Sequence, residues 1–131
     1  MFDHVGVHPY SYPARPTDES TGAWNTFVRL PAVREVMVDN GDTDTSIWIT
    51  EYGAPTGSSQ VAVTEQEQAE SLIEALGQAR AWPWVDAFFV YNLRDQGDPA
   101  DPEQNFGLIR ADGSEKPAYR ALAAAHPCHN G

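Results

Sequence analysis

The chain has 131 residues, 41% of them hydrophobic, so it is long enough for one domain and too apolar for a disordered segment. Its formal net charge of −11 argues against nucleic acids and anionic membrane surfaces as partners, because both are bound through basic surfaces. No run of about 18 apolar residues occurs, so no transmembrane segment is predicted.

The first predicted strand covers residues 4–8 and is ended by Pro9. Because this strand starts almost at Met1, we expect the chain to begin in the middle of a fold. After a loop rich in proline, tyrosine and serine, apolar spacing predicts two helical pieces, 24–30 and 31–39. Asn40 and Gly41 then provide a helix stop.

The second predicted strand, residues 46–50, is apolar and β-branched and is followed at once by Glu51. Gly53 and Pro55 then break the strand into a loop. A carboxylate at the tip of a buried strand is costly to place unless it is paired or used. Glu51 is therefore a candidate catalytic carboxylate, and the alternative is a loop carboxylate that faces water.

The second half of the chain repeats the strand-then-helix pattern. Thr64 and Glu67 form a capping box that opens an amphipathic helix. That helix ends near Trp82 and Trp84, which we interpret as packing residues. A third strand, residues 87–92, is apolar on both faces, as expected for a parallel strand covered by helices. An acidic loop, residues 94–105 with Asp95 among its carboxylates, is expected to be solvated and leads to a last helix that starts near Pro117.

The order of elements is therefore three successive βα units, which predicts an α/β fold with parallel strands and helices outside. In such folds ligands bind at the carboxyl ends of the strands. The loops at those ends carry His8, Tyr10 and Glu51.

Several motifs resemble clan A of the glycoside hydrolases, the retaining (β/α)₈ glycosidases that include family 5 cellulases and family 39 xylosidases. The segment from Trp48 to Gly53 is similar to the strand that ends in the nucleophile, and His8-Pro9-Tyr10 matches the His-x-Tyr motif one unit upstream. Two closing motifs are also similar, and they comprise Asn105-Phe106-Gly107-Leu108 and Lys116-Pro117-Ala118-Tyr119.

This resemblance implies that residues 1–131 are the C-terminal part of a (β/α)₈ TIM barrel, strands 6 to 8. It implies that Glu51 is the nucleophile, that Tyr10 orients it by a hydrogen bond, and that His8 contacts the substrate. The clan's general acid/base is a Glu that follows an Asn on the fourth strand, and no Asn-Glu pair occurs in this sequence. We therefore expect the isolated chain to be largely inactive.

Further residues are candidates for the rim of a sugar site. Tyr52 and Asn92 lie beside the predicted strand ends, and Tyr91 stands where the clan has a Trp that stacks on the sugar. That departure leaves the identity of the sugar open. Trp48 is interpreted as a core residue, because strict strand alternation would point it away from the face that carries Glu51.

No cofactor or metal is predicted. The motifs G-x-S-x-G, G-x-G-x-x-G and the P-loop do not occur. Cys128 is the one cysteine, and with His126 and His129 it would make a weak metal site in a tail expected to fray.

Two functions follow from the sequence. The first is hydrolysis of a β-linked carbohydrate by a retaining mechanism, as part of a longer enzyme. The alternative is a non-catalytic carbohydrate-binding or assembly module, because three parallel strands leave two edges unpaired. The expected partners are a carbohydrate and either the missing N-terminal part of the barrel or a second copy. The cellular compartment stays open, and the resemblance implies export of a full-length form.

Overall fold

The computed structural model describes residues 3–125, and Cys128, His126 and His129 lie outside the described residues. Three parallel strands form one sheet in the order β1-β2-β3. The bounds of these strands are β1 His4–Val7, β2 Ser46–Tyr52 and β3 Val85–Val90. The predicted α/β class with parallel strands and helices is therefore confirmed.

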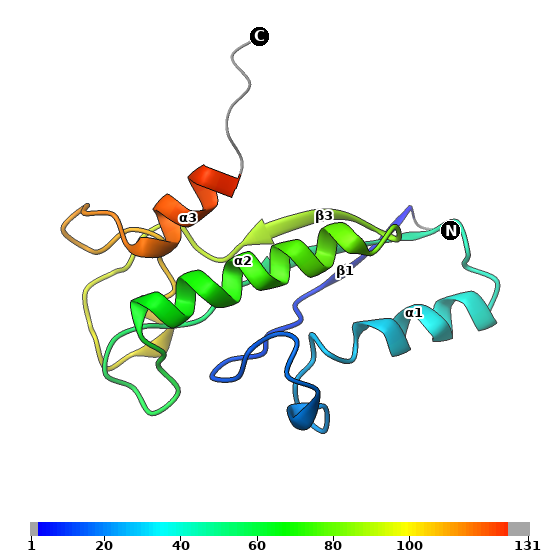
Figure 1. Cartoon of the computed structure of the whole chain (residues 1–131), viewed down its shortest axis with the longest axis horizontal. Helices are drawn as coiled ribbons and strands as arrows, with labels where there is room; N and C mark the ends of the chain where they lie inside the picture. Colours follow the sequence, from blue (N-terminus) through cyan, green and yellow to red (C-terminus); the bar gives the residue numbers. More distant parts are fainter. Residues whose placement is uncertain (1–2, 126–131) are drawn as a thin grey trace, which may run out of the picture.

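Three α-helices and two short 3₁₀ turns are the other elements of residues 3–125. Their bounds are η1 Glu19–Thr21, α1 Leu30–Asp39, α2 Glu65–Ala81, η2 Pro102–Gln104 and α3 Pro117–Ala125. Figure 1 shows α2 lying along the sheet with α3 close to it, whereas α1 stands apart from both.

The helix α2 starts as the sequence predicts. The Thr64 hydroxyl accepts the Glu67 N–H at 3.1 Å, and the Glu67 carboxylate accepts the Thr64 N–H at 2.8 Å. This reciprocal capping satisfies two backbone donors that would otherwise be unpaired at the helix end.

The predicted helical piece 24–30 is wrong, because residues 24–29 form turns and α1 begins only at Leu30. The buried Asn25 side chain accepts the N–H groups of Phe27 and Val28, at 3.1 and 3.3 Å. Such local side-chain bonds offer the backbone an alternative to the helical ladder.

The core lies between the sheet and the helices. Its buried members come from the turn before α1, from the first residue of α1, from β2 and from the two C-terminal helices, and they are Phe27, Leu30, Ile49, Tyr52, Ala69, Leu72, Ala75, Ala79 and Ala118. Trp82 and Trp84 stack on one another at 4.8 Å between ring centroids and pack against this core, as predicted.

The opposite face of the sheet is less covered than the sequence predicts. Phe89 is 50% exposed, so β3 is not buried on both faces. Trp48 is half-buried and lies outside the helix-packed core. Its ring stacks on His4 with 4.4 Å between ring centroids, and its centroid lies 6.2 Å from that of Phe89. The interpretation of Trp48 as a core residue is therefore wrong for this structure.

Candidate active site

Glu51 lies at the carboxyl end of β2, with its side chain 36% exposed. One carboxylate oxygen, Oε2, accepts a hydrogen bond from the Tyr10 hydroxyl at 2.9 Å. The same oxygen lies 3.5 Å from Nδ1 of His8. The structure thus brings two predicted site residues, Tyr10 and His8, to the carboxylate of a third, Glu51.

The parallel pairing of β1 with β2 explains this meeting. Val7 pairs with Ile49 at the end of the ladder, so the residues that follow Val7 emerge beside those that follow Ile49. The Tyr10 backbone is held by the Thr26 hydroxyl, which donates to its carbonyl at 2.6 Å.

The loop that carries Tyr10 is also tied to α2. Arg15 donates from Nε to Glu74 at 2.8 Å and from Nη1 to Glu70 at 2.6 Å. The hydroxyl of Thr17 donates to Glu74 as well. These bonds fix the loop on the helix, so the position of Tyr10 does not depend on β1 alone.

The environment of Tyr10 keeps its hydroxyl protonated. Burial, the hydrogen bond to Glu51 and the negative charge of that carboxylate together raise the pKa of Tyr10 well above its ordinary value. Tyr10 is therefore a neutral hydrogen-bond donor at physiological pH, and it can stabilise a negative charge on Glu51.

Aromatic rings line the space around this pair. The buried Phe106 ring makes edge contacts with Tyr10, Tyr12 and Tyr91, at centroid distances of 5.8, 5.4 and 5.3 Å. Tyr10 and Tyr12 also contact each other at 5.5 Å. The three tyrosines come from two different loops and meet around one phenylalanine.

Tyr91 and Asn92 follow β3, and the peptide bond between them is cis. The Tyr91 N–H donates to the Tyr52 carbonyl at 2.9 Å, and the Asn92 N–H donates to the Phe106 carbonyl at 3.2 Å. Among residues 3–125, Oδ1 of Asn92 is buried without a hydrogen-bond partner. Tyr91 and Asn92 remain predicted substrate-binding residues.

The prediction that Tyr52 binds substrate is wrong. Tyr52 is 0% exposed, its hydroxyl shares a 2.8 Å hydrogen bond with Ser11, and its ring contacts Phe27 and Phe88. The register between β2 and β3 shifts between Ile49 and Tyr52, so alternation is interrupted and both residues join the core. Burial raises the pKa of the Tyr52 hydroxyl, with the Ser11 hydrogen bond as a smaller opposing effect.

Sequence reasoning missed the environment of Asp95, which was assigned to a solvated acidic loop. Its side chain is only 9% exposed and lies 2.8 Å from Nζ of Lys116, which is 1% exposed. The one signal in the sequence was that Lys116 is the sole lysine of the chain, placed directly before Pro117.

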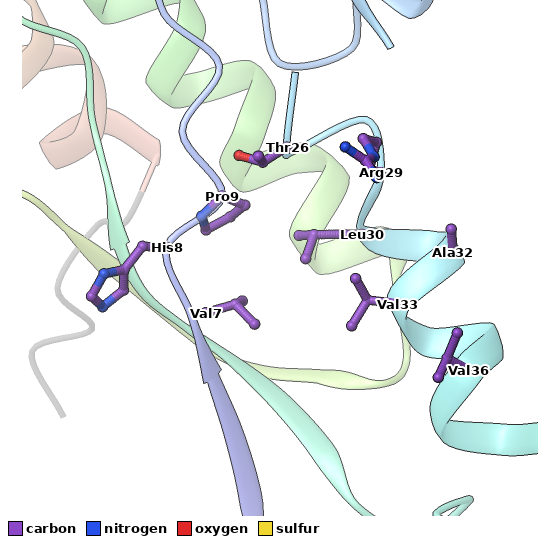
Figure 2. A pocket seen from close by; sticks show the side chains of 9 residues that line it. All are labelled: Val7, His8, Pro9, Thr26, Arg29, Leu30, Ala32, Val33 and Val36. Atoms are coloured by element: carbon purple, nitrogen blue, oxygen red, sulfur yellow. The ribbon is translucent and has the colours of Figure 1, made fainter. Parts of the chain in front are cut away.

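An apolar pocket of about 380 Å³ lies close to the site but does not include Glu51. It is formed where the end of β1 faces the start of α1, and its lining residues are Val7, His8, Pro9, Thr26, Arg29, Leu30, Ala32, Val33 and Val36. Figure 2 shows Val7 and Val33 pointing toward one another, while the His8 ring lies on the other side of β1. This pocket therefore adjoins the polar site around Glu51, with which it shares His8, but Glu51 itself does not line it.

In the part of the chain that the structure describes, no cluster of three or more His, Cys, Asp or Glu side chains could hold a metal ion. Within residues 3–125, no helix has the length and apolar character needed to span a bilayer.

Comparison with known proteins points to glycoside hydrolases. No family model matches the chain, and no curated protein matches it either. Among solved structures, a family 39 glycoside hydrolase from Bacteroides cellulosilyticus WH2 is similar over 98% of this chain and 28% of its own, with 29% identity and a TM-score of 0.74.

Two further structures share the fold at lower identity. A GH2 β-galacturonidase from Eisenbergiella tayi matches 93% of this chain and 23% of its own, with 18% identity and a TM-score of 0.68. A β-glucuronidase from Bifidobacterium dentium matches 95% of this chain and 20% of its own, with 18% identity and a TM-score of 0.64. The chain thus spans 28% or less of the length of each of these three glycoside hydrolases.

Proposed function

We propose that this chain supplies the nucleophile of a clan A retaining glycosidase, of family 5 or 39 type, that hydrolyses O-glycosidic bonds in a β-linked carbohydrate. In this proposal residues 1–131 are strands 6 to 8 of a (β/α)₈ barrel and act as part of a longer enzyme. The observation that carries the proposal is the strand-end carboxylate of Glu51 with the Tyr10 hydroxyl 2.9 Å away and His8 beside it.

The chemistry of a retaining glycosidase assigns a role to each of these groups. Glu51 attacks the anomeric carbon, the C–O bond to the leaving group breaks, and a glycosyl-enzyme ester forms. A second carboxyl group about 5–5.5 Å away protonates the leaving oxygen and then activates the water that releases the sugar. Tyr10 stabilises the Glu51 carboxylate before attack and on its release, because it stays a neutral donor.

The sugar would occupy the space beside the tyrosine cluster. Aromatic rings suit the apolar faces of sugars, so Tyr91 and Tyr12 are the proposed stacking surfaces. His8 is 53% exposed in its side chain and lies at hydrogen-bonding reach of the same region, so it would contact a sugar hydroxyl near the reacting carbon. Asn92 would add a polar contact.

The second carboxyl group has no candidate in the sequence that matches the clan's Asn-Glu motif. Loss of leaving-group protonation typically lowers a rate by about 10²–10⁴-fold. We therefore expect the 131-residue chain alone to hydrolyse aryl β-glycosides with poor leaving groups at most very slowly. Normal rates with such substrates would show that the acid is present after all.

The nucleophile is tested in a longer protein that contains this chain and has glycosidase activity. Glu51→Gln keeps the size and the hydrogen-bonding capacity of the side chain but removes the nucleophilic charge, so turnover should be abolished. Glu35→Gln on α1 is the matched control and should retain turnover, because Glu35 is an exposed helical residue, whereas Glu51 lies at the end of β2. Turnover retained in Glu51→Gln would refute the assignment.

A second candidate is an assembly or carbohydrate-binding module, and a specific observation favours it. In the described residues β1 and β3 each pair with β2 alone, so each leaves an edge unpaired. The apolar side chains of Phe89 and Val36 are 50% and 62% exposed, and the apolar pocket lies beside the β1 edge. Such surfaces favour association with the missing part of a barrel or with a second copy.

Sedimentation of the 131-residue chain shows whether it is a monomer or associates with another chain. A dimer or a complex with a separately produced barrel fragment would support association through the open edges. A well-folded monomer at high concentration would contradict both the association and the part-barrel interpretation.

A further inference from the structure

A buried ion pair lies behind the aromatic cluster and outside the groups that would touch a substrate. Nζ of Lys116 lies 3.0 and 2.8 Å from the two carboxylate oxygens of Asp95. It also donates to the Thr56 hydroxyl at 2.9 Å and to the Asn105 carbonyl at 3.4 Å. All three donor positions of the ammonium group are thus used inside the protein, where an unpaired charge would be very costly.

This pair holds the backbone on both sides of Phe106. On one side, the Asn105 carbonyl accepts from Lys116 and from the Thr56 N–H at 3.0 Å. On the other side, the Gly107 N–H donates to Asp95 at 2.8 Å. Gly107 permits this close approach, because a Cβ there would lie 2.3 Å from the Asp95 nitrogen.

Phe106 in turn is the ring around which the site tyrosines gather. Its ring contacts Tyr10 and Tyr91, and the Tyr10 hydroxyl reaches Glu51 at 2.9 Å. Displacement of Phe106 would therefore leave the Tyr10 ring without this packing partner, and the Tyr10 hydroxyl is the group that orients the Glu51 carboxylate.

We propose that Lys116 and Asp95 are positioning residues that fix Phe106 and, through its ring, hold Tyr10 against Glu51. This inference rests on the proposed function for its catalytic meaning, although the positioning itself is a property of the fold. The competing explanation is that the ion pair only fastens α3 to the rest of the chain, in which case Tyr10 would not respond to its loss.

The test places a fluorinated tyrosine at position 10 of the 131-residue chain and follows its ionisation by fluorine NMR as pH is raised. Such a phenol ionises closer to neutral pH than that of tyrosine, so the protein need not be taken to extreme pH. The reference is the same residue in a short unstructured peptide. Burial and the Glu51 hydrogen bond should make it ionise at higher pH in the protein than in the peptide.

The main variant combines Lys116→Met with Asp95→Ala, which removes both charges and avoids leaving one buried charge unpaired. The matched control combines Arg110→Met with Glu65→Ala. It removes an ion pair between the same closing segment and α2, with a donor–acceptor distance of 2.8 Å. The Arg110 side chain donates instead to Glu65, Ser114 and the Glu115 carbonyl, away from the backbone of residues 105–107.

The main variant should shift the ionisation at position 10 most of the way toward the peptide value, and the control should leave it unchanged. Phe106→Leu, which removes the ring but no charge, should give a similar shift, and combining it with the main variant should add little. The proposal would be overturned if the main variant were folded by circular dichroism and position 10 still ionised at the same pH as in the unsubstituted chain. It would also be overturned if the main variant and the control shifted this ionisation equally. If the main variant does not fold, Phe106→Leu decides by itself, and an unchanged ionisation at position 10 in that variant would overturn the proposal.

Failure of this proposal is distinguishable from failure of the proposed function. The fluorine signal reports the Tyr10–Glu51 contact whether or not Glu51 is a nucleophile. Conversely, loss of turnover in Glu51→Gln would stand even if position 10 did not respond to Lys116 and Asp95.

Discussion

Replacement of Gly53 by alanine probes the junction at which the site is assembled. Gly53 follows β2 directly, and an added Cβ would lie 2.0 Å from the Tyr91 carbonyl oxygen and 3.2 Å from the Phe106 ring. Real Cβ contacts almost never fall below 3.0 Å. Because the obstructing atom belongs to backbone, the segments that follow β2 and β3 must separate by roughly 1 Å.

The energetic cost follows from this separation. Forcing an extra carbon into a packed site costs typically about 1–3 kcal/mol. The separation also strains the 2.9 Å hydrogen bond from Tyr91 to Tyr52, worth about 1 kcal/mol. Loss of glycine freedom in the unfolded chain returns about 0.4–1 kcal/mol. The net destabilisation of Gly53→Ala should therefore be about 1–3 kcal/mol.

Gly77→Ala is the matched control, and its effect on the free energy of unfolding should have the opposite sign. Gly77 lies inside α2, and apart from its chain neighbours and the helix's own backbone no atom of the described residues lies within 4 Å of its added Cβ. The same chemical change should therefore stabilise the chain by roughly 0.5–1 kcal/mol.

Urea unfolding followed by tryptophan fluorescence measures both variants. With a denaturant dependence of about 2 kcal/mol/M, the two unfolding midpoints should differ by about 1–2 M. A Gly53→Ala chain as stable as the unsubstituted one would mean that Tyr91 does not approach β2 as described.

Three further outcomes are expected. In an active longer protein, Tyr10→Phe should lower the rate at which the glycosyl-enzyme is hydrolysed by roughly 10–100-fold, since negative charge returns to Glu51 in that step and a hydrogen bond to a charged group is worth about 1.5–3 kcal/mol; pre-steady-state kinetics would check this. Burial raises the pKa of the Tyr52 hydroxyl, so the unfolded chain loses that proton first. The stability that Tyr52 contributes is therefore full below about pH 10. Above it Tyr52 should account for a fall of about 1.4 kcal/mol per pH unit in the free energy of unfolding, so the fall should be less steep by that amount in Tyr52→Phe. Thr64→Ala should cost about 1 kcal/mol in urea unfolding by removing the N-cap of α2, and an unchanged midpoint would contradict the capping role.

The features that could be predicted from the sequence are local or belong to a motif. The capping box at Thr64 needs only residues three positions apart. Glu51 and Tyr10 could be linked because parallel pairing brings successive strand ends together, and the His-x-Tyr motif supplied the partner.

The features that could not be predicted depend on tertiary contacts. Strict alternation assigned Trp48 to the core, and the position of Tyr52 beside a strand end assigned it to the rim, because neither takes account of the register shift after Ile49. Asp95 looked like one of several loop carboxylates, since nothing in its neighbours reveals that Lys116 lies against it. Turn formation at 24–29 likewise depends on a buried Asn25 side chain.

Covalent trapping would decide whether Glu51 is a nucleophile. An active protein that contains this chain would be incubated with a set of 2-deoxy-2-fluoro-β-glycosides that carry good leaving groups, digested, and mapped by mass spectrometry. We expect one fluorosugar attached to Glu51, and no attachment in Glu51→Gln. A sugar attached to another carboxylate, or turnover without any trapped ester, would contradict the role proposed for Glu51.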